Sequence, residues 1–207
     1  MPAKQKAAPR KKKTATFDCA LIEIENENVN DVTAREVHVQ QGSVRDIKKA
    51  DTVSITMGGA NAVDAKSVTV TQGGIVQVNA DTVSVQQGGI ARVEAETVQV
   101  TQGGIGLAQA ETIELQASGA VAILGTTIEV QAGGAQWMLA RESIRVEQGG
   151  AVVVAAPRVE IENGFVGLLF ARDVHGNVRT LFDQRGALVF GIAAGIVMGL
   201  LARSRRS

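Results

Sequence analysis

Few side chains in this 207-residue sequence are suited to acid–base or nucleophilic chemistry, and they are scattered. The two histidines, His38 and His175, stand near opposite ends of the chain, so they do not suggest a shared catalytic site. A single cysteine, Cys19, excludes an intrachain disulfide and a cysteine-based metal site. Glu114 and Glu129 are fifteen residues apart and are expected to be solvated charges on a polar face. We therefore predict no catalytic residue, no metal and no cofactor, and a protein that is not an enzyme.

Ligand-binding motifs are equally scarce. No GxxxxGK[ST] motif occurs, and the Gly-Gly pairs lie between strand-like stretches instead of opening helices, so phosphate binding has no support. The basic residues have no aromatic neighbours, so nucleic acid is not an expected partner. Uniform repeats without long loops leave no cleft for a small-molecule substrate.

A fifteen-residue repeat dominates the sequence. Its frame runs from Cys19 to Ala171, with one-residue insertions only in the turns that begin at Ala34 and Ala140. Such a period predicts a solenoid, in which each repeat contacts only its neighbours. Four consecutive repeats are ADTVSVQQGGIARVE from Ala80, AETVQVTQGGIGLAQ from Ala95, AETIELQASGAVAIL from Ala110 and GTTIEVQAGGAQWML from Gly125.

Each repeat follows the pattern A-x-x-V-x-V-x-Q-G-G-I-x-x-V-x, whose first two valines alternate with the period of a strand. A helix is excluded because β-branched residues dominate and each Gly would cost about 1 kcal/mol in a helix. We predict an all-β fold: a single-stranded β-solenoid (β-helix) of about ten 15-residue coils over residues 19–182. His175–Val178 is expected to form a tight turn that caps its C-terminal end.

Stacked coils place equivalent residues in columns. Outward columns of Thr, Ser and Gln, such as the one from Thr52 to Thr127, form a flat polar face. The predicted inward columns are Val53, Val68, Val83, Val98, Ile113 and Ile128; then Ile55, Val70, Val85, Val100, Leu115 and Val130; and then Ala60, Ile75, Ile90, Ile105, Ala120 and Ala135.

The repeated phrase A-x-x-V-x-V-x-x-G-G-x-x-x-x-V, without long loops and behind a basic N-terminal arm, resembles the bactofilins. These are bacterial cytoskeletal proteins that form polymers and have a β-helical core. The resemblance covers about residues 19–171 and implies a β-helical architecture and a tendency to polymerise. It assigns no functional residue.

Basic residues gather at both ends of a chain whose net charge is zero. Residues 1–18 are predicted to be a disordered basic arm, which either contacts anionic lipid or simply aids solubility. The arm lacks the apolar run of a signal peptide, so we expect it to start in the cytoplasm. The candidate lipid contacts are Lys11, Lys12, Lys13, Arg203, Arg205 and Arg206.

Residues 183–207 are predicted to hold a membrane anchor helix and a basic tail. The segment ALVFGIAAGIVMGLLA, residues 187–202, is uncharged and bounded by arginines, although it is short for a span of about 20 residues. Gly191, Gly195 and Gly199 recur at every fourth position, a pattern that favours helix self-association. We expect a single-pass membrane protein with the solenoid on the cytoplasmic side, because no export signal is seen.

Two columns become apolar toward the C-terminus. One reads Gln77, Arg92, Leu107, Ala122, Trp137, and the other reads Asn79, Glu94, Gln109, Leu124, Leu139. If they are exposed, Leu107, Leu124, Trp137 and Leu139 form a candidate lateral interface. The alternative is that the strand turns inward after the glycine corner, so that these residues belong to the core.

Two non-catalytic functions remain. The first is a membrane-tethered structural scaffold that self-associates, with a filament-forming cytoskeletal element as one form; its partners are further copies of the chain and the lipid membrane. The second is a binding or adhesion module that uses the flat Thr/Ser/Gln face.

Overall fold

The computed structural model describes residues 14–16 and 21–180, with side chains described from residue 21 to residue 176. The elements in these ranges are all strands, and β5 and β8 are long because strand pairing continues through successive corners. Their bounds are β1 (Thr14–Thr16), β2 (Leu21–Glu25), β3 (Asn28–Thr33), β4 (Glu36–Gln40), β5 (Ser43–Thr101), β6 (Gly103–Gln116), β7 (Ser118–Val130) and β8 (Gly133–Thr180).

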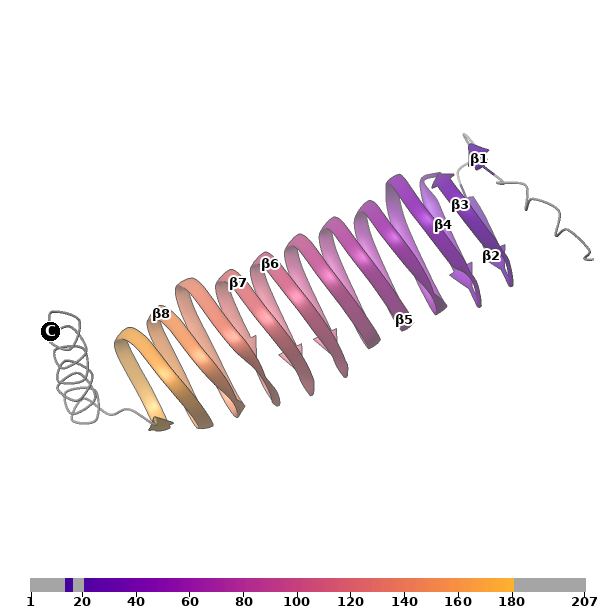
Figure 1. The fold of residues 1–207 in the computed structure, drawn as a ribbon. Coiled ribbons are helices and arrows are strands. Elements are labelled where there is room, and N and C mark those ends of the chain that lie inside the picture. The colour runs from indigo at the N-terminus through magenta and orange to yellow at the C-terminus, as the bar shows by residue number, and fades with distance from the viewer. Residues whose placement is uncertain (1–13, 17–20, 181–207) are drawn as a thin grey trace, which may run out of the picture.

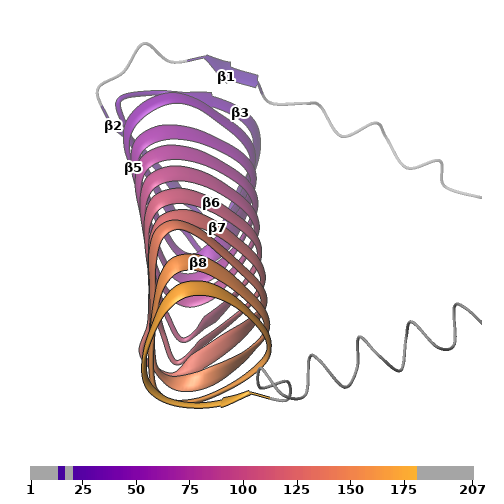
Figure 2. The ribbon, with the colours of Figure 1, turned by 90° about the vertical axis from the view of Figure 1, so that its left-hand side faces the viewer.

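The chain winds into a parallel β-solenoid of about eight turns, which form an elongated rod (Figure 1). Viewed nearly along its axis, successive coils superimpose as flattened loops around one interior (Figure 2). The predicted all-β solenoid is confirmed. The predicted count of about ten coils is higher than the number of turns found.

The pairing register confirms the period. Val98 pairs with Ile113, and Ile113 pairs with Ile128, each fifteen residues further on. The offset becomes sixteen where Thr127 pairs with Ser143, so the extra residue of the turn that begins at Ala140 is accommodated there. Equivalent residues therefore stay in column along the whole rod.

The other insertion forms a local bulge. The offset changes from fifteen at Val32, which pairs with Ile47, to sixteen further along. Between these points Lys49 adopts a positive φ of 57°, and the amides of Asp51 and Thr52 both donate to the carbonyl of Arg35, at 2.8 and 3.0 Å. Two residues facing one is the signature of a β-bulge, which absorbs an extra residue without displacing later coils.

The core is made of the predicted columns. All six members of the column from Val53 to Ile128 are fully buried, and the column from Ile55 to Val130 is buried as well. Only Ala120, in the third predicted column, is partly exposed. A fourth buried column, which the sequence analysis did not assign, consists of Val63, Val78, Val93, Ala108, Ile123 and Met138.

The first glycine of each Gly-Gly pair lies where coils approach most closely. A Cβ added at Gly88 would overlap the carbonyl oxygen of Gly73 in the preceding coil, whereas one added at Gly89 would meet nothing nearer than the Gly104 oxygen at 3.5 Å. Ser118 occupies the first position in one coil. It is the one buried polar side chain found among residues 21–176, and its hydroxyl lies 2.7 Å from the Gln116 oxygen and 3.1 Å from the Val100 oxygen.

The C-terminal turn expected over His175–Val178 is not a separate cap. These residues continue β8 to Thr180, with a corner at Gly176, where φ is 101°. The predicted anchor helix, with Gly191, Gly195 and Gly199, lies outside the described residues. Within the part of the chain that is described, no helix is long and apolar enough to span a membrane.

The two glycines of one corner allow a matched stability test. Gly88→Ala should lower the free energy of unfolding by at least about 2 kcal/mol, because its methyl group displaces the neighbouring coil. Gly89→Ala, whose methyl group would make only an ordinary van der Waals contact at the same corner, should change it by less than about 0.5 kcal/mol. Chemical denaturation of both variants measures the difference, and equal effects would contradict close stacking at the first glycine.

Candidate interaction surfaces

The structure does not bring the potentially reactive side chains together. His38 lies in β4 and His175 near the end of β8, with the intervening coils between them. No group of three or more His, Cys, Asp or Glu residues within the described ranges could hold a metal ion. Glu114 and Glu129 are partly exposed neighbours in adjacent coils, and the Gln99 amide donates to Glu114 at 2.9 Å.

One surface ion pair shifts the pKa values of its members. Lys66 Nζ lies 2.7 Å from Asp51 Oδ1, and this hydrogen bond, aided by charge attraction, lowers the pKa of Asp51 and raises the pKa of Lys66. The stabilisation is present above the unfolded pKa of the carboxyl group and is lost as the pH falls through its folded pKa. Both side chains are well exposed, so solvent screens the pair and its contribution is small.

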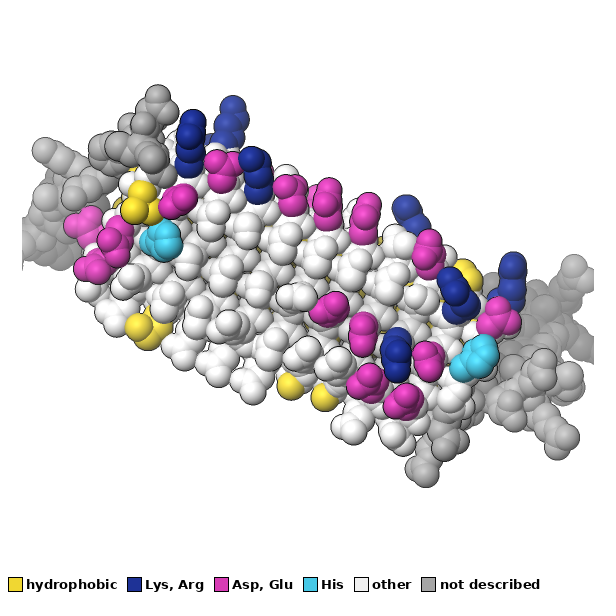
Figure 3. Space-filling model, turned by 180° about the vertical axis from the view of Figure 1, so that it is seen from behind, with side chains coloured by type: hydrophobic (Ala, Val, Ile, Leu, Met, Phe, Trp, Pro, Cys, Tyr) yellow, Lys and Arg dark blue, Asp and Glu magenta, His cyan; other side chains and the backbone are white. Residues whose placement is uncertain are grey.

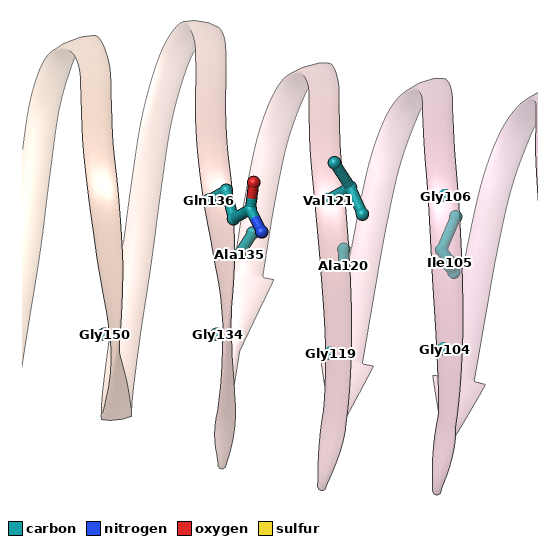
Figure 4. A pocket seen from close by; sticks show the side chains of 10 residues that line it. All are labelled: Gly104, Ile105, Gly106, Gly119, Ala120, Val121, Gly134, Ala135, Gln136 and Gly150. Carbon is teal, nitrogen blue, oxygen red and sulfur yellow. The ribbon is translucent and has the colours of Figure 1, made fainter.

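A shallow groove follows the glycine corner across four coils (Figure 4). Its volume is about 560 Å³, and glycines such as Gly104 and Gly119 line it beside Ile105, Val121 and Gln136. The Val121 and Gln136 side chains stand out from adjacent coils (Figure 4). This lining contains no charged or nucleophilic side chain, so it offers nothing for acid–base catalysis.

A second groove, which we call the axial groove, runs along the rod and has a volume of about 890 Å³. Its floor is the column of small residues that starts each repeat, and its walls are the outward residues on either side. The floor is Ala80, Ala95, Ala110, Gly125, Ala140 and Ala156; one wall is Asn79, Glu94, Gln109, Leu124 and Leu139; the other is Asp81, Glu96, Glu111, Thr126 and Arg141. The groove is thus acidic toward the N-terminus and partly apolar toward the C-terminus.

The candidate lateral interface is on the surface. Trp137 is 50% exposed, Leu139 41% and Leu124 37%, while Leu107 is half-buried. The alternative that places these residues in the core is therefore wrong, because the strand alternates about the buried column that contains Ile123 and Met138.

The same columns continue beyond the residues that the sequence analysis singled out. Leu168 is 43% exposed and Phe170 63%. A Cβ added to Gly167 would lie 2.7 Å from the Val152 oxygen, so Gly167 stacks on Val152 of the preceding coil. Leu168, the next residue, therefore falls in the same column as Trp137. The signal was available, since both residues occupy the same repeat positions. We call Leu107, Leu124, Trp137, Leu139, Leu168 and Phe170 the apolar strip.

The middle of the flat polar face is largely uncharged, and charged side chains gather along its edge and near both of its ends (Figure 3). On the corner beside this face, Gln72 donates to Gln87 and Gln87 donates to Gln102, each at 3.1 Å. These amides satisfy one another along the stack, so this ladder has a structural explanation. Arg145 lies 3.8 Å from both Glu147 and Glu162 on the charged part.

The proposed lipid contacts Lys11, Lys12, Lys13, Arg203, Arg205 and Arg206 lie outside the described residues and stay predictions. Comparisons of the chain with protein-family models, with curated proteins and with solved structures found no match. The resemblance to bactofilins therefore also stays a prediction, and the surfaces of the rod carry the functional argument.

Proposed function

We propose that this protein is a non-catalytic structural scaffold that self-associates side by side and is tethered to a membrane by a C-terminal helix. The apolar strip is the observation that carries the proposal. Its side chains come from four of five neighbouring coils and form an exposed apolar patch on a rigid surface, which the coil that begins at Ala140 interrupts with the buried Val153. Such patches on soluble surfaces mark contacts with a partner.

The size of the strip suits a weak and repeated contact. From Leu107 to Leu168 it spans roughly 20 Å of the axis at about 4.8 Å per coil, and it is only one strand wide. A stable pair of proteins usually buries about 800 Å² on each partner, more than this strip provides. Single contacts are therefore weak, and association depends on many copies held close together.

A membrane tether supplies that concentration. If residues 187–202 form an anchor helix with Gly191, Gly195 and Gly199 on one face, neighbouring helices approach closely and hold the rods in parallel. Tethering raises the effective concentration of one strip near the next without any new contact on the rod. The solenoid then lies on the cytoplasmic face, and the resemblance to bactofilins agrees with a polymer-forming role.

The alternative, a binding or adhesion module that uses the polar face, has less support. Near the C-terminal end of this face, the charged residues Arg145, Glu147 and Glu162 interrupt the regular array of outward Thr, Ser and Gln side chains. The apolar strip has no such interruption from Leu124 to Leu139.

Polar substitution of the strip should weaken association without unfolding the rod. In the double variant Trp137→Ser, Leu139→Ser, the apparent association constant should fall at least about tenfold, because two exposed apolar side chains are lost from each copy. The matched control Val76→Ser, Val121→Ser changes side chains that are 54% and 50% exposed outside the strip and should leave association unchanged. Analytical ultracentrifugation measures association and thermal unfolding measures stability. Unchanged association in the strip variant would contradict the proposal.

Removal of residues 187–207 should move the protein from the membrane fraction to the soluble fraction, because the uncharged segment is deleted. Fractionation followed by a high-salt wash checks this. If the truncated protein stayed on membranes after the wash, the anchor would lie elsewhere, since attraction by the N-terminal lysines alone is screened by salt.

A further inference from the structure

The acidic part of the axial groove lies on the N-terminal side of the leucines that the groove shares with the apolar strip, and its charge favours a cationic ligand. It is walled by Asp81, Glu96 and Glu111 in three successive coils. We propose that this part of the groove binds the basic N-terminal arm of the same chain, residues 1–13, as an extended segment laid along the rod.

Charge is the first argument. Glu96 and Glu111 are exposed, and neither forms an ion pair with another of the described side chains. Glu94, on the opposite wall, is already held by Arg92 at 2.7 Å. Carboxylates stacked at about 4.8 Å repel one another, and a cationic segment between the walls relieves that repulsion. Of the groove's lining residues only Arg141, at its far end, carries a positive charge.

Shape is the second argument. The floor consists of Ala80, Ala95 and Ala110 in this part, so no side chain longer than a methyl group rises between the walls. An extended backbone can therefore lie low in the groove while its lysines reach the flanking carboxylates. The arm reads MPAKQKAAPRKKK, and its AAP segment is small and free of aromatic groups, which suits a narrow floor of alanines. Pro9 favours an extended backbone.

Reach is the third argument. The strand β1 pairs with β3 through Thr14 and Asp31 at the N-terminal end of the rod, so the arm starts there. Thirteen extended residues span about 45 Å, whereas the coil of Glu111 is roughly 30 Å away along the axis at about 4.8 Å per coil. This geometry brings Lys4 and Lys6, the lysines furthest from β1, level with Glu96 and Glu111.

Nearer the N-terminal end the surface differs. Lys66 is bound to Asp51, and the groove lining begins only at Asn79. The arm therefore has to pass this stretch before it meets free carboxylates, which explains why Lys4 and Lys6 are the residues assigned to the groove. The matching lengths favour the arm of the same molecule over the arm of a neighbour.

Limited trypsin digestion of the full-length protein at low salt tests the binding. Cleavage at Lys4 and Lys6 should become about fivefold faster in the variant Glu96→Gln, Glu111→Gln, which loses two exposed charges without adding a cleavage site. The control Glu114→Gln, Glu129→Gln removes two stacked charges from the polar face and should leave the rate unchanged. Raising the salt concentration should speed cleavage of the wild-type arm.

Zero-length coupling of amines to carboxylates locates the arm. In the wild-type monomer, mass spectrometry should find Lys4 or Lys6 joined to Glu96 or Glu111. Three results would overturn the proposal: equal cleavage rates in all variants, cross-links found only between two copies, or protection of the arm that appears only when vesicles containing anionic lipid are added. The first result would show that the arm does not bind the groove. The second would show that the groove binds the arm of a neighbouring molecule, and the third that the arm binds lipid.

Discussion

The close approach of consecutive coils at the glycine corner is the constraint on which the rest of the structure depends. At this corner a Cβ on Gly88 or Gly103 would overlap the preceding coil's carbonyl oxygen, so these coils stack this closely because the side chain is absent, while one coil accommodates Ser118 at the equivalent position. Once the corner is fixed, residues at equal repeat positions lie above one another, and four columns close into one dry interior. The outward side chains are stacked in the same way, so a charge or an apolar side chain that recurs at one repeat position forms a stripe along the rod.

Much of this architecture could be predicted from the sequence. Apolar residues that alternate with a period of two indicate strands, and their recurrence every fifteen residues indicates one coil per repeat, so few other folds are compatible with the pattern. The columns through Val98 and Val100 are buried as predicted, and both insertions appear as sixteen-residue offsets. The burial pattern after the glycine corner could not be predicted from the sequence. There, two consecutive residues of the repeat both point outward, so the alternation of inward and outward side chains is shifted by one residue. The burial of the column that contains Val93 and the exposure of Trp137 depend on that backbone bend, which the period does not encode.

The candidate surfaces were predictable only in part, for a related reason. The drift of two columns toward apolar residues was visible in the sequence, yet its extension to Leu168 and Phe170 follows from the stacking of the last coils. The axial groove was not predicted at all. A groove arises where a small residue lies between two larger ones on the outside of a bend, as in the column of alanines that starts each repeat.

These features together describe a rod whose faces differ in chemistry while its backbone does not. One flank carries the apolar strip and the acidic part of the axial groove, and the flat face is largely uncharged (Figure 3). Electron cryo-microscopy of the full-length protein reconstituted into lipid vesicles tests the central claim most directly. The account predicts rods side by side on the membrane, in contact along the C-terminal halves of their solenoids. Isolated rods at every surface density would contradict it.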